Sequence, residues 1–230
     1  MQLQGTPLSK QAIHQTGRNC QLYLVVETGA AVLERLSAAL AAAPVASVLL
    51  KTHHSASADP AALKALVEAC QKRGIATLVN GDAALARTMR ADGVHLPWSP
   101  QLIADYTEAR DILGNRYMIG VEIDPKSEAA RHEAMELAEA GADYIGFSAG
   151  TGAGELGSQF DLVSWWAEIF EVPCVAFDVM DGPAAASFAA TGVEFIAVPL
   201  AAAVAPADGA ARIAEIAARV GARALQEQPT

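Results

Sequence analysis

The sequence predicts an α/β protein folded as a closed (β/α)8 TIM barrel. Short apolar runs alternate with alanine-rich amphipathic stretches, as in consecutive strand–helix units. Eight such units fit between Leu22 and about Val220, near the lower bound of about 200 residues for this fold. Three similar segments begin at Arg90, Ala140 and Thr191, about 50 residues apart, and mark every second strand. A doubly wound open sheet is the alternative fold.

The predicted strands are short and apolar without strict alternation, as expected for strands covered on both faces. In chain order they are Leu22–Val26, Ala46–Leu50, Ala76–Val79, Gly93–Leu96, Tyr117–Val121, Tyr144–Phe147, Cys174–Phe177 and Phe195–Val198. Helices are predicted at about 30–42, 60–73, 82–91, 99–113, 126–140, 160–170, 182–191 and 208–223. We expect one domain over 1–230, with residues 1–20 as an N-terminal extension and 224–230 as a frayed tail.

Composition and charge exclude several classes of protein. A chain of 230 residues that is 52% hydrophobic can bury a sizeable core. Sixteen basic against 26 acidic residues give a net charge of −10, so we expect no nucleic-acid partner. Apolar runs such as Ala38–Val48 are broken and fall short of the roughly 20 residues that a bilayer requires, so we expect no membrane span. Without a signal-peptide pattern, the expected location is cytoplasmic.

Candidate site residues are the polar side chains that follow the predicted strands, because ligands bind at the carboxyl ends of barrel strands. They are Glu27, Lys51, Thr52, His53, His54, Asn80, Asp82, His95, Trp98, Glu122, Asp124, Ser148, Thr151, Asp178 and Asp181. Imidazoles beside carboxylates suit a transition metal or acid–base chemistry, so a metal or acid–base enzyme is one hypothesis. His95 lies inside a strand, where a hydrogen-bonded structural role is the simpler interpretation.

A glycine-rich segment at Gly152–Gly157 matches G-x-G-x-x-G. A dinucleotide fingerprint should open the first strand–helix unit and be followed about 20 residues later by an acidic residue at the end of a strand. Neither condition is met here, so a lid or a plain loop is the preferred interpretation.

Several segments resemble the thiamine phosphate synthase family, which includes a thiazole tautomerase branch. The similar segments are Leu22–Val26, Ala76–Asp82, Leu85–Leu96, Ile119–Val121 and Ala138–Phe147. The resemblance runs with gaps from about Leu22 to Ala203. It implies a barrel transferase that couples hydroxymethylpyrimidine diphosphate to a thiazole phosphate and releases pyrophosphate. It also implies a small phosphate or heterocycle as ligand, magnesium as cofactor and a small homo-oligomer.

The resemblance also assigns roles to residues of this chain. The predicted catalytic residues are Lys51, in the family's diphosphate-binding run, and Glu122, at the position of a serine beside the leaving group. The predicted substrate-binding residues are His53, Asn80, Ser148, Thr151 and Asp178, and the predicted magnesium ligand is Asp82.

The chain departs from the family pattern at the groups that hold phosphate and magnesium. Leu49, Gly81, Pro100 and Leu156 stand at positions where the family has polar or charged residues. Asp178 and Val179 match a glycine pair after the seventh strand, and Pro199 in the eighth cannot donate a hydrogen bond. The sequence therefore predicts a thiamine phosphate synthase-like protein with a remodelled site, and the alternative is a non-catalytic or regulatory descendant.

Overall fold

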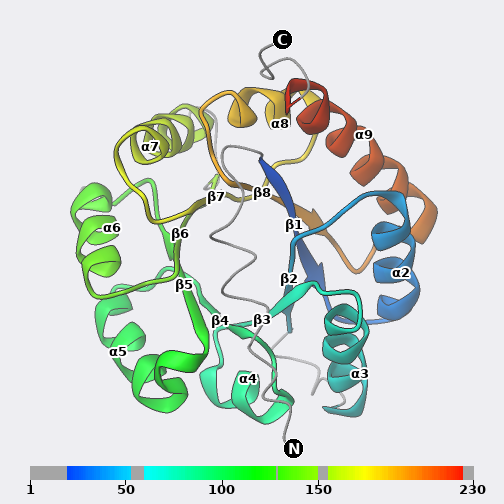
Figure 1. Cartoon of the computed structure of the whole chain (residues 1–230), viewed down its shortest axis with the longest axis horizontal. Helices are drawn as coiled ribbons and strands as arrows, with labels where there is room; N and C mark the ends of the chain where they lie inside the picture. Colours follow the sequence, from blue (N-terminus) through cyan, green and yellow to red (C-terminus); the bar gives the residue numbers. More distant parts are fainter. Residues whose placement is uncertain (1–19, 53–59, 128, 150–154, 225–230) are drawn as a thin grey trace, which may run out of the picture.

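Eight parallel strands pair in chain order and close into a barrel in the computed structural model, which describes residues 20–52, 60–127, 129–149 and 155–224 (Figure 1). The strands are β1 (Gln21–Glu27), β2 (Ser47–Lys51), β3 (Ala76–Asn80), β4 (Gly93–Leu96), β5 (Met118–Ile123), β6 (Tyr144–Phe147), β7 (Cys174–Ala176) and β8 (Phe195–Leu200). Closure rests on β1–β8 pairing, in which Tyr23 is opposite Ala197 and Val25 opposite Pro199. The predicted barrel is confirmed and the open sheet is excluded.

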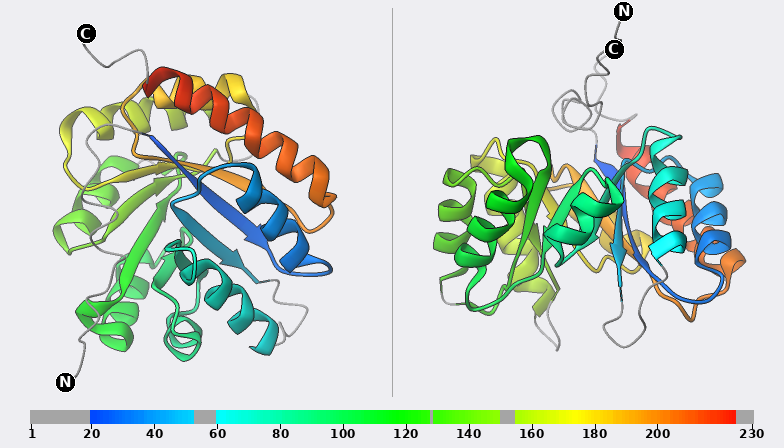
Figure 2. Two further views of the ribbon diagram at one scale, coloured as in Figure 1. Left: turned by 45° about the vertical axis from the view of Figure 1, so that its right-hand side comes forward. Right: turned by 90° about the horizontal axis from the view of Figure 1, so that it is seen from below.

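Helices surround the strands as an outer ring (Figures 1 and 2). In the described part of the chain they are α2 (Val32–Ala42), α3 (Pro60–Gln71), α4 (Ala83–Met89), α5 (Leu102–Leu113), α6 (Ala130–Glu139), α7 (Glu155–Ile169), α8 (Gly182–Ala189) and α9 (Pro206–Ala224), with a short 3-10 helix, η1 (Gly114–Arg116). The last helix, α9, lies between α8 and α2 and so completes the ring (Figure 1). Over these described helices, none has both the length and the apolar character needed to cross a membrane.

Two elements differ from the sequence prediction in ways that affect the site. Strand β5 continues past Val121 to Ile123, because Glu122 and Ile123 pair with Gly146 and Phe147 of β6. Helix α7 begins at Glu155 rather than near residue 160, so the end of the glycine-rich motif is helical. The buried Gln159 amide donates to the carbonyls of Phe147 and Phe177 at 2.7 and 2.8 Å, which attaches α7 to the ends of β6 and β7.

Alternation along the strands separates two apolar layers. Outward-facing residues such as Leu24, Val94 and Val121 pack beneath the helices in one core cluster. Inward-facing residues fill the barrel itself as a second cluster that includes Tyr23, Leu49, Leu78, Met118, Tyr144, Phe177 and Phe195. Because the side-chain period of a strand is two, every second residue of each strand shares the enclosed interior.

Glycines make room for the aromatic rings inside the barrel. A Cβ atom at Gly120 would lie 1.9 Å from a ring carbon of Tyr144, and one at Gly146 would lie 2.6 Å from the ring of Phe177. Real Cβ atoms do not approach so closely, so the rings occupy the volume that larger residues would fill. The bulky interior of this barrel therefore depends on glycine at both positions.

We expect Gly120→Ala to lower the free energy of unfolding by about 1–3 kcal/mol, because the Tyr144 ring must move within a filled interior. The matched control is Gly221→Ala in α9, where nothing lies within 4 Å of the added methyl and the helix gains up to about 1 kcal/mol. Urea denaturation measures both. Equal effects of the two substitutions would show that the interior tolerates the extra carbon.

Candidate active site at the carboxyl ends of the strands

Four polar side chains continue the inward-facing series at the carboxyl ends of their strands. Glu27 follows Tyr23 and Val25 in β1, and Lys51 follows Leu49 in β2. Asn80 follows Leu78 in β3, and Glu122 lies two residues after Gly120 in β5. The strand alternation that buries the apolar residues therefore gathers these polar groups around one opening.

The remaining predicted site residues are placed less uniformly. Ser148 follows β6 and hydrogen-bonds Glu122, so it belongs to the same opening. Asp178 follows β7, is exposed, and accepts a long hydrogen bond of 3.4 Å from the Ala149 amide. Its φ of 57° is left-handed, a conformation that aspartate tolerates better than most residues and that agrees with its match to a family glycine. His53 and Thr151 lie outside the described residues.

A chain of hydrogen bonds runs from the opening into the barrel through His95. The ring is fully buried, and its Nε2 lies 3.2 Å from Oε2 of Glu122. Its Nδ1 lies 2.9 Å from the Tyr144 hydroxyl, which is 3.0 Å from the Tyr23 hydroxyl. An ionised carboxylate only accepts, so Nε2 donates to Glu122, while Nδ1 and the two tyrosine hydroxyls share the remaining hydrogen bonds of the chain. Each polar atom in this chain thus has a partner inside an apolar interior.

Electrostatics keep Glu122 charged and the two phenols neutral. Burial alone would raise the pKa of Glu122, but the hydrogen bond and the charge of His95, a hydrogen bond from Ser148 and the positive charge of Lys51 hold that pKa below its usual range. Burial raises the pKa of Tyr23 and that of Tyr144 well above the usual value. The opening therefore presents a carboxylate at β5 and an ammonium group at β2, close enough for their charges to interact.

Sequence reasoning missed the two tyrosines. Tyr23 and Tyr144 lie in apolar runs, where a tyrosine is usually part of the core, so nothing in the pattern distinguished them. The useful signal is their position in the strand alternation. Both tyrosines share the inward face of the barrel strands, the same face on which the polar groups stand at the strand ends. The interpretation of His95 as a buried, hydrogen-bonded residue agrees with its two contacts.

The predicted magnesium ligand, Asp82, has a structural task in this fold. Its Oδ1 accepts a hydrogen bond from the Leu85 amide at 2.7 Å and caps the N-terminus of α4. Within the described ranges no three His, Cys, Asp or Glu side chains are grouped to hold a metal ion. Magnesium at Asp82 stays a prediction.

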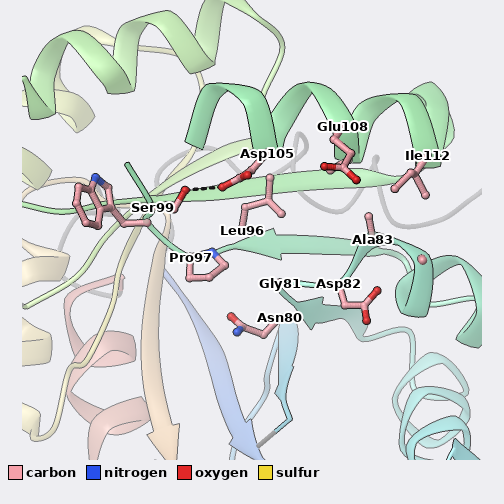
Figure 3. Close-up of a pocket in the computed structure, with 13 residues that line it drawn as sticks. Asn80, Gly81, Asp82, Ala83, Leu96, Pro97, Ser99, Asp105, Glu108 and Ile112 are labelled. Carbon is pink, nitrogen blue, oxygen red and sulfur yellow. Dashed lines mark hydrogen bonds between the residues drawn. The ribbon is translucent and has the colours of Figure 1, made fainter. Parts of the chain in front are cut away.

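An acidic groove of about 510 Å³ adjoins the opening between the β3–α4 and β4–α5 turns (Figure 3). Asn80 and Asp82 line one side, and Asp105 and Glu108 of α5 line the other. The Ser99 hydroxyl donates to the carboxylate of Asp105, as the dashed line in Figure 3 marks. Three carboxylates along one groove disfavour an anionic ligand there.

Taken together, the closed parallel barrel and the polar ring at its carboxyl end define a (β/α)8 barrel protein with a candidate small-molecule site. The family model described as thiamine monophosphate synthase matches residues 22–202. A thiamine-phosphate synthase of Rhodospirillum centenum is 34% identical over 190 residues, which are 78% of this chain and 87% of the relative. The chain belongs to the thiamine monophosphate synthase family.

Further relatives agree with this assignment. A thiamine-phosphate synthase of Erythrobacter litoralis is 38% identical over 138 residues, which cover 56% of this chain but only 60% of the relative. Among solved structures, a thiamine phosphate pyrophosphorylase from Pyrococcus furiosus aligns with a TM-score of 0.68 and 19% identity, covering 89% of this chain and 98% of that one. A Mycobacterium tuberculosis tryptophan synthase aligns with a TM-score of 0.67 and 16% identity, covering 93% and 96%. These structures show the fold alone.

The lowered pKa of Glu122 makes part of the stability depend on pH. A carboxylate whose pKa is lower in the folded state stabilises the fold above its ordinary pKa, and this contribution is lost as the pH falls through the lowered value. We therefore expect the difference in urea midpoint between the wild type and Glu122→Gln to be larger at pH 7 than at pH 3. A difference that grows on acidification would contradict the interpretation.

Two substitutions at Asp82 distinguish a helix-capping role of its side chain from a ligand-binding role. We expect Asp82→Ala to lower the free energy of unfolding by about 1 kcal/mol, because the Leu85 amide loses its acceptor. Asp82→Asn keeps a side-chain oxygen at the cap, so it should retain most of that stability while removing the charge. Thermal melts of the three proteins measure this, and equal losses in both variants would exclude the capping role.

Proposed function

We propose that this chain is a transferase of thiamine biosynthesis that joins a pyrimidine methyl diphosphate to a thiazole, the reaction type of its family. Membership of the family and the electrostatic interaction of Lys51 with Glu122 at one opening support the proposal. In this reaction the CH2–O bond breaks and both of its electrons leave with the diphosphate. The thiazole nitrogen lone pair then forms the new C–N bond to the methylene carbon.

The charges at the opening match the charges that this ionisation separates. The leaving diphosphate gains negative charge, which Lys51 on β2 would neutralise, while positive charge develops on the pyrimidine methylene, which the carboxylate of Glu122 on β5 would stabilise. Preorganised charges of this kind act without reorganisation during the reaction. His95 holds Glu122 in place, because the imidazole is itself fixed by Tyr144.

Asn80 and Ser148 complete the proposed substrate site. The Asn80 side chain has both a donor and an acceptor at the end of β3, which suits the edge of an aminopyrimidine ring. Ser148 hydrogen-bonds Glu122 and so helps to orient that carboxylate. The proposal therefore gives Lys51 and Glu122 the electrostatic roles and uses neutral groups to orient the heterocycle.

Pyrophosphate release tests the proposal, with hydroxymethylpyrimidine diphosphate as donor, magnesium in the buffer, and hydroxyethylthiazole or its phosphate ester as acceptor. We expect Lys51→Ala to lower kcat by about 10²–10³-fold, as for the loss of one preorganised charged group. The control is Lys126→Ala, an exposed lysine in the loop after β5, which should stay within two-fold.

Glu122→Gln should also lower kcat, since the amide cannot offset a developing positive charge. Melting temperatures of all variants are measured alongside to show that they fold. Wild-type protein that releases no pyrophosphate with either acceptor, or Lys51→Ala that retains full turnover, would falsify the proposal.

A further inference from the structure

The turn after β8 is the place where a barrel of this kind usually holds a phosphate group, through backbone amides near a helix N-terminus. In this chain the Ala202 amide in that turn donates to Oε2 of Glu27 at 3.0 Å. Glu27 reaches it from the end of β1, which pairs with β8. A carboxylate of the protein thus already occupies a donor that a ligand phosphate would need.

Two arginines fix the loops that make this contact. The side chain of Arg35 in α2 is buried and donates to the carbonyl of Glu27 at 2.7 Å and to the carbonyl of Ala30. Arg212 in α9 donates to the carbonyl of Pro199 in β8. Both guanidinium groups therefore hold backbone on either side of the Glu27–Ala202 contact, so the carboxylate is positioned by the fold.

The neighbouring turn adds a second negative charge. Asp178 follows β7, the strand beside β8, and its carboxylate faces the Ala149 amide. Pro199, at an inward position of β8, contributes no amide donor. An incoming phosphate would find the Ala202 amide already occupied by the Glu27 carboxylate, which has Lys51 of β2 as its register neighbour.

We propose that Glu27 is a specificity-determining residue that excludes phosphate from the β8–α9 turn, so that the thiazole acceptor of this chain carries a free hydroxyl group. This inference rests on the proposed function and deepens it. A carboxylate has several acceptor sites, so Glu27 can bind both the Ala202 amide and the hydroxyl hydrogen of the acceptor. With such an acceptor, the coupling yields unphosphorylated thiamine together with pyrophosphate.

Equilibrium binding tests the inference without requiring turnover. Calorimetry compares three probes, namely hydroxyethylthiazole, its phosphate ester and inorganic phosphate. We expect the wild type to bind the alcohol at least ten-fold more tightly than the ester. Glu27→Ala frees the Ala202 amide, so its affinity for the ester and for inorganic phosphate should rise at least ten-fold.

Control variants separate occupation of the turn from a general change in charge. Glu34→Ala removes an exposed carboxylate of α2 that does not contact the turn, so it should leave the preference within two-fold. Glu27→Gln keeps an oxygen acceptor for the Ala202 amide and removes only the charge, so its gain for the ester should be about three-fold. If Glu27→Ala does not fold, the Glu27→Gln gain decides the inference.

Three results would overturn the inference: a wild type that binds the ester as tightly as the alcohol, a Glu27→Ala variant with no gain for either phosphate probe, or no gain in Glu27→Gln. Failure of the proposed function is a separate result. If neither acceptor is coupled to the pyrimidine but the binding preference changes in Glu27→Ala as expected, the transfer reaction is wrong and the role of Glu27 stands.

Discussion

The polar interior of the barrel depends on the buried imidazole of His95. A ring with no solvent exposure must satisfy both nitrogens from the protein, and it does so through Glu122 and Tyr144. This requirement links the buried interior of the barrel to its opening, because the imidazole that hydrogen-bonds Tyr144 also orients Glu122. The space for the tyrosine exists only because residue 120 is a glycine. Packing inside the barrel thus determines where the carboxylate stands at the site.

The charged groups at the opening come from strands on different sides of the barrel. Lys51 on β2 is in register with Glu27 on β1, and its charge also reaches Glu122 on β5. Asp178, after β7, adds a further carboxylate. Under the proposed function, Lys51 is therefore the group that the diphosphate end of the donor would approach, and the Glu27 contact with Ala202 would disfavour phosphate on the acceptor.

The barrel could be predicted from the sequence because its evidence is repetitive: the strand–helix alternation and the spacing of three similar segments are visible without contacts. Lys51, Asn80 and Glu122 could also be predicted as candidate site residues, because each follows an apolar run of the sequence. The capping role of Asp82 could have been found from an aspartate immediately before an alanine-rich helix. The contact of Glu27 with Ala202 could not, because it joins residues 175 positions apart through a backbone amide, and no sequence pattern marks such a donor.

The same contact gives a backbone donor of the β8–α9 turn a partner from within the protein. A turn built to bind phosphate leaves amide donors that need a partner whenever the ligand is absent. Here Glu27 supplies that partner for the Ala202 amide. Under the proposal, this contact alters what the opening accepts without involving the apolar layers beneath the helices. Such a separation of site from core lets one scaffold serve different substrates.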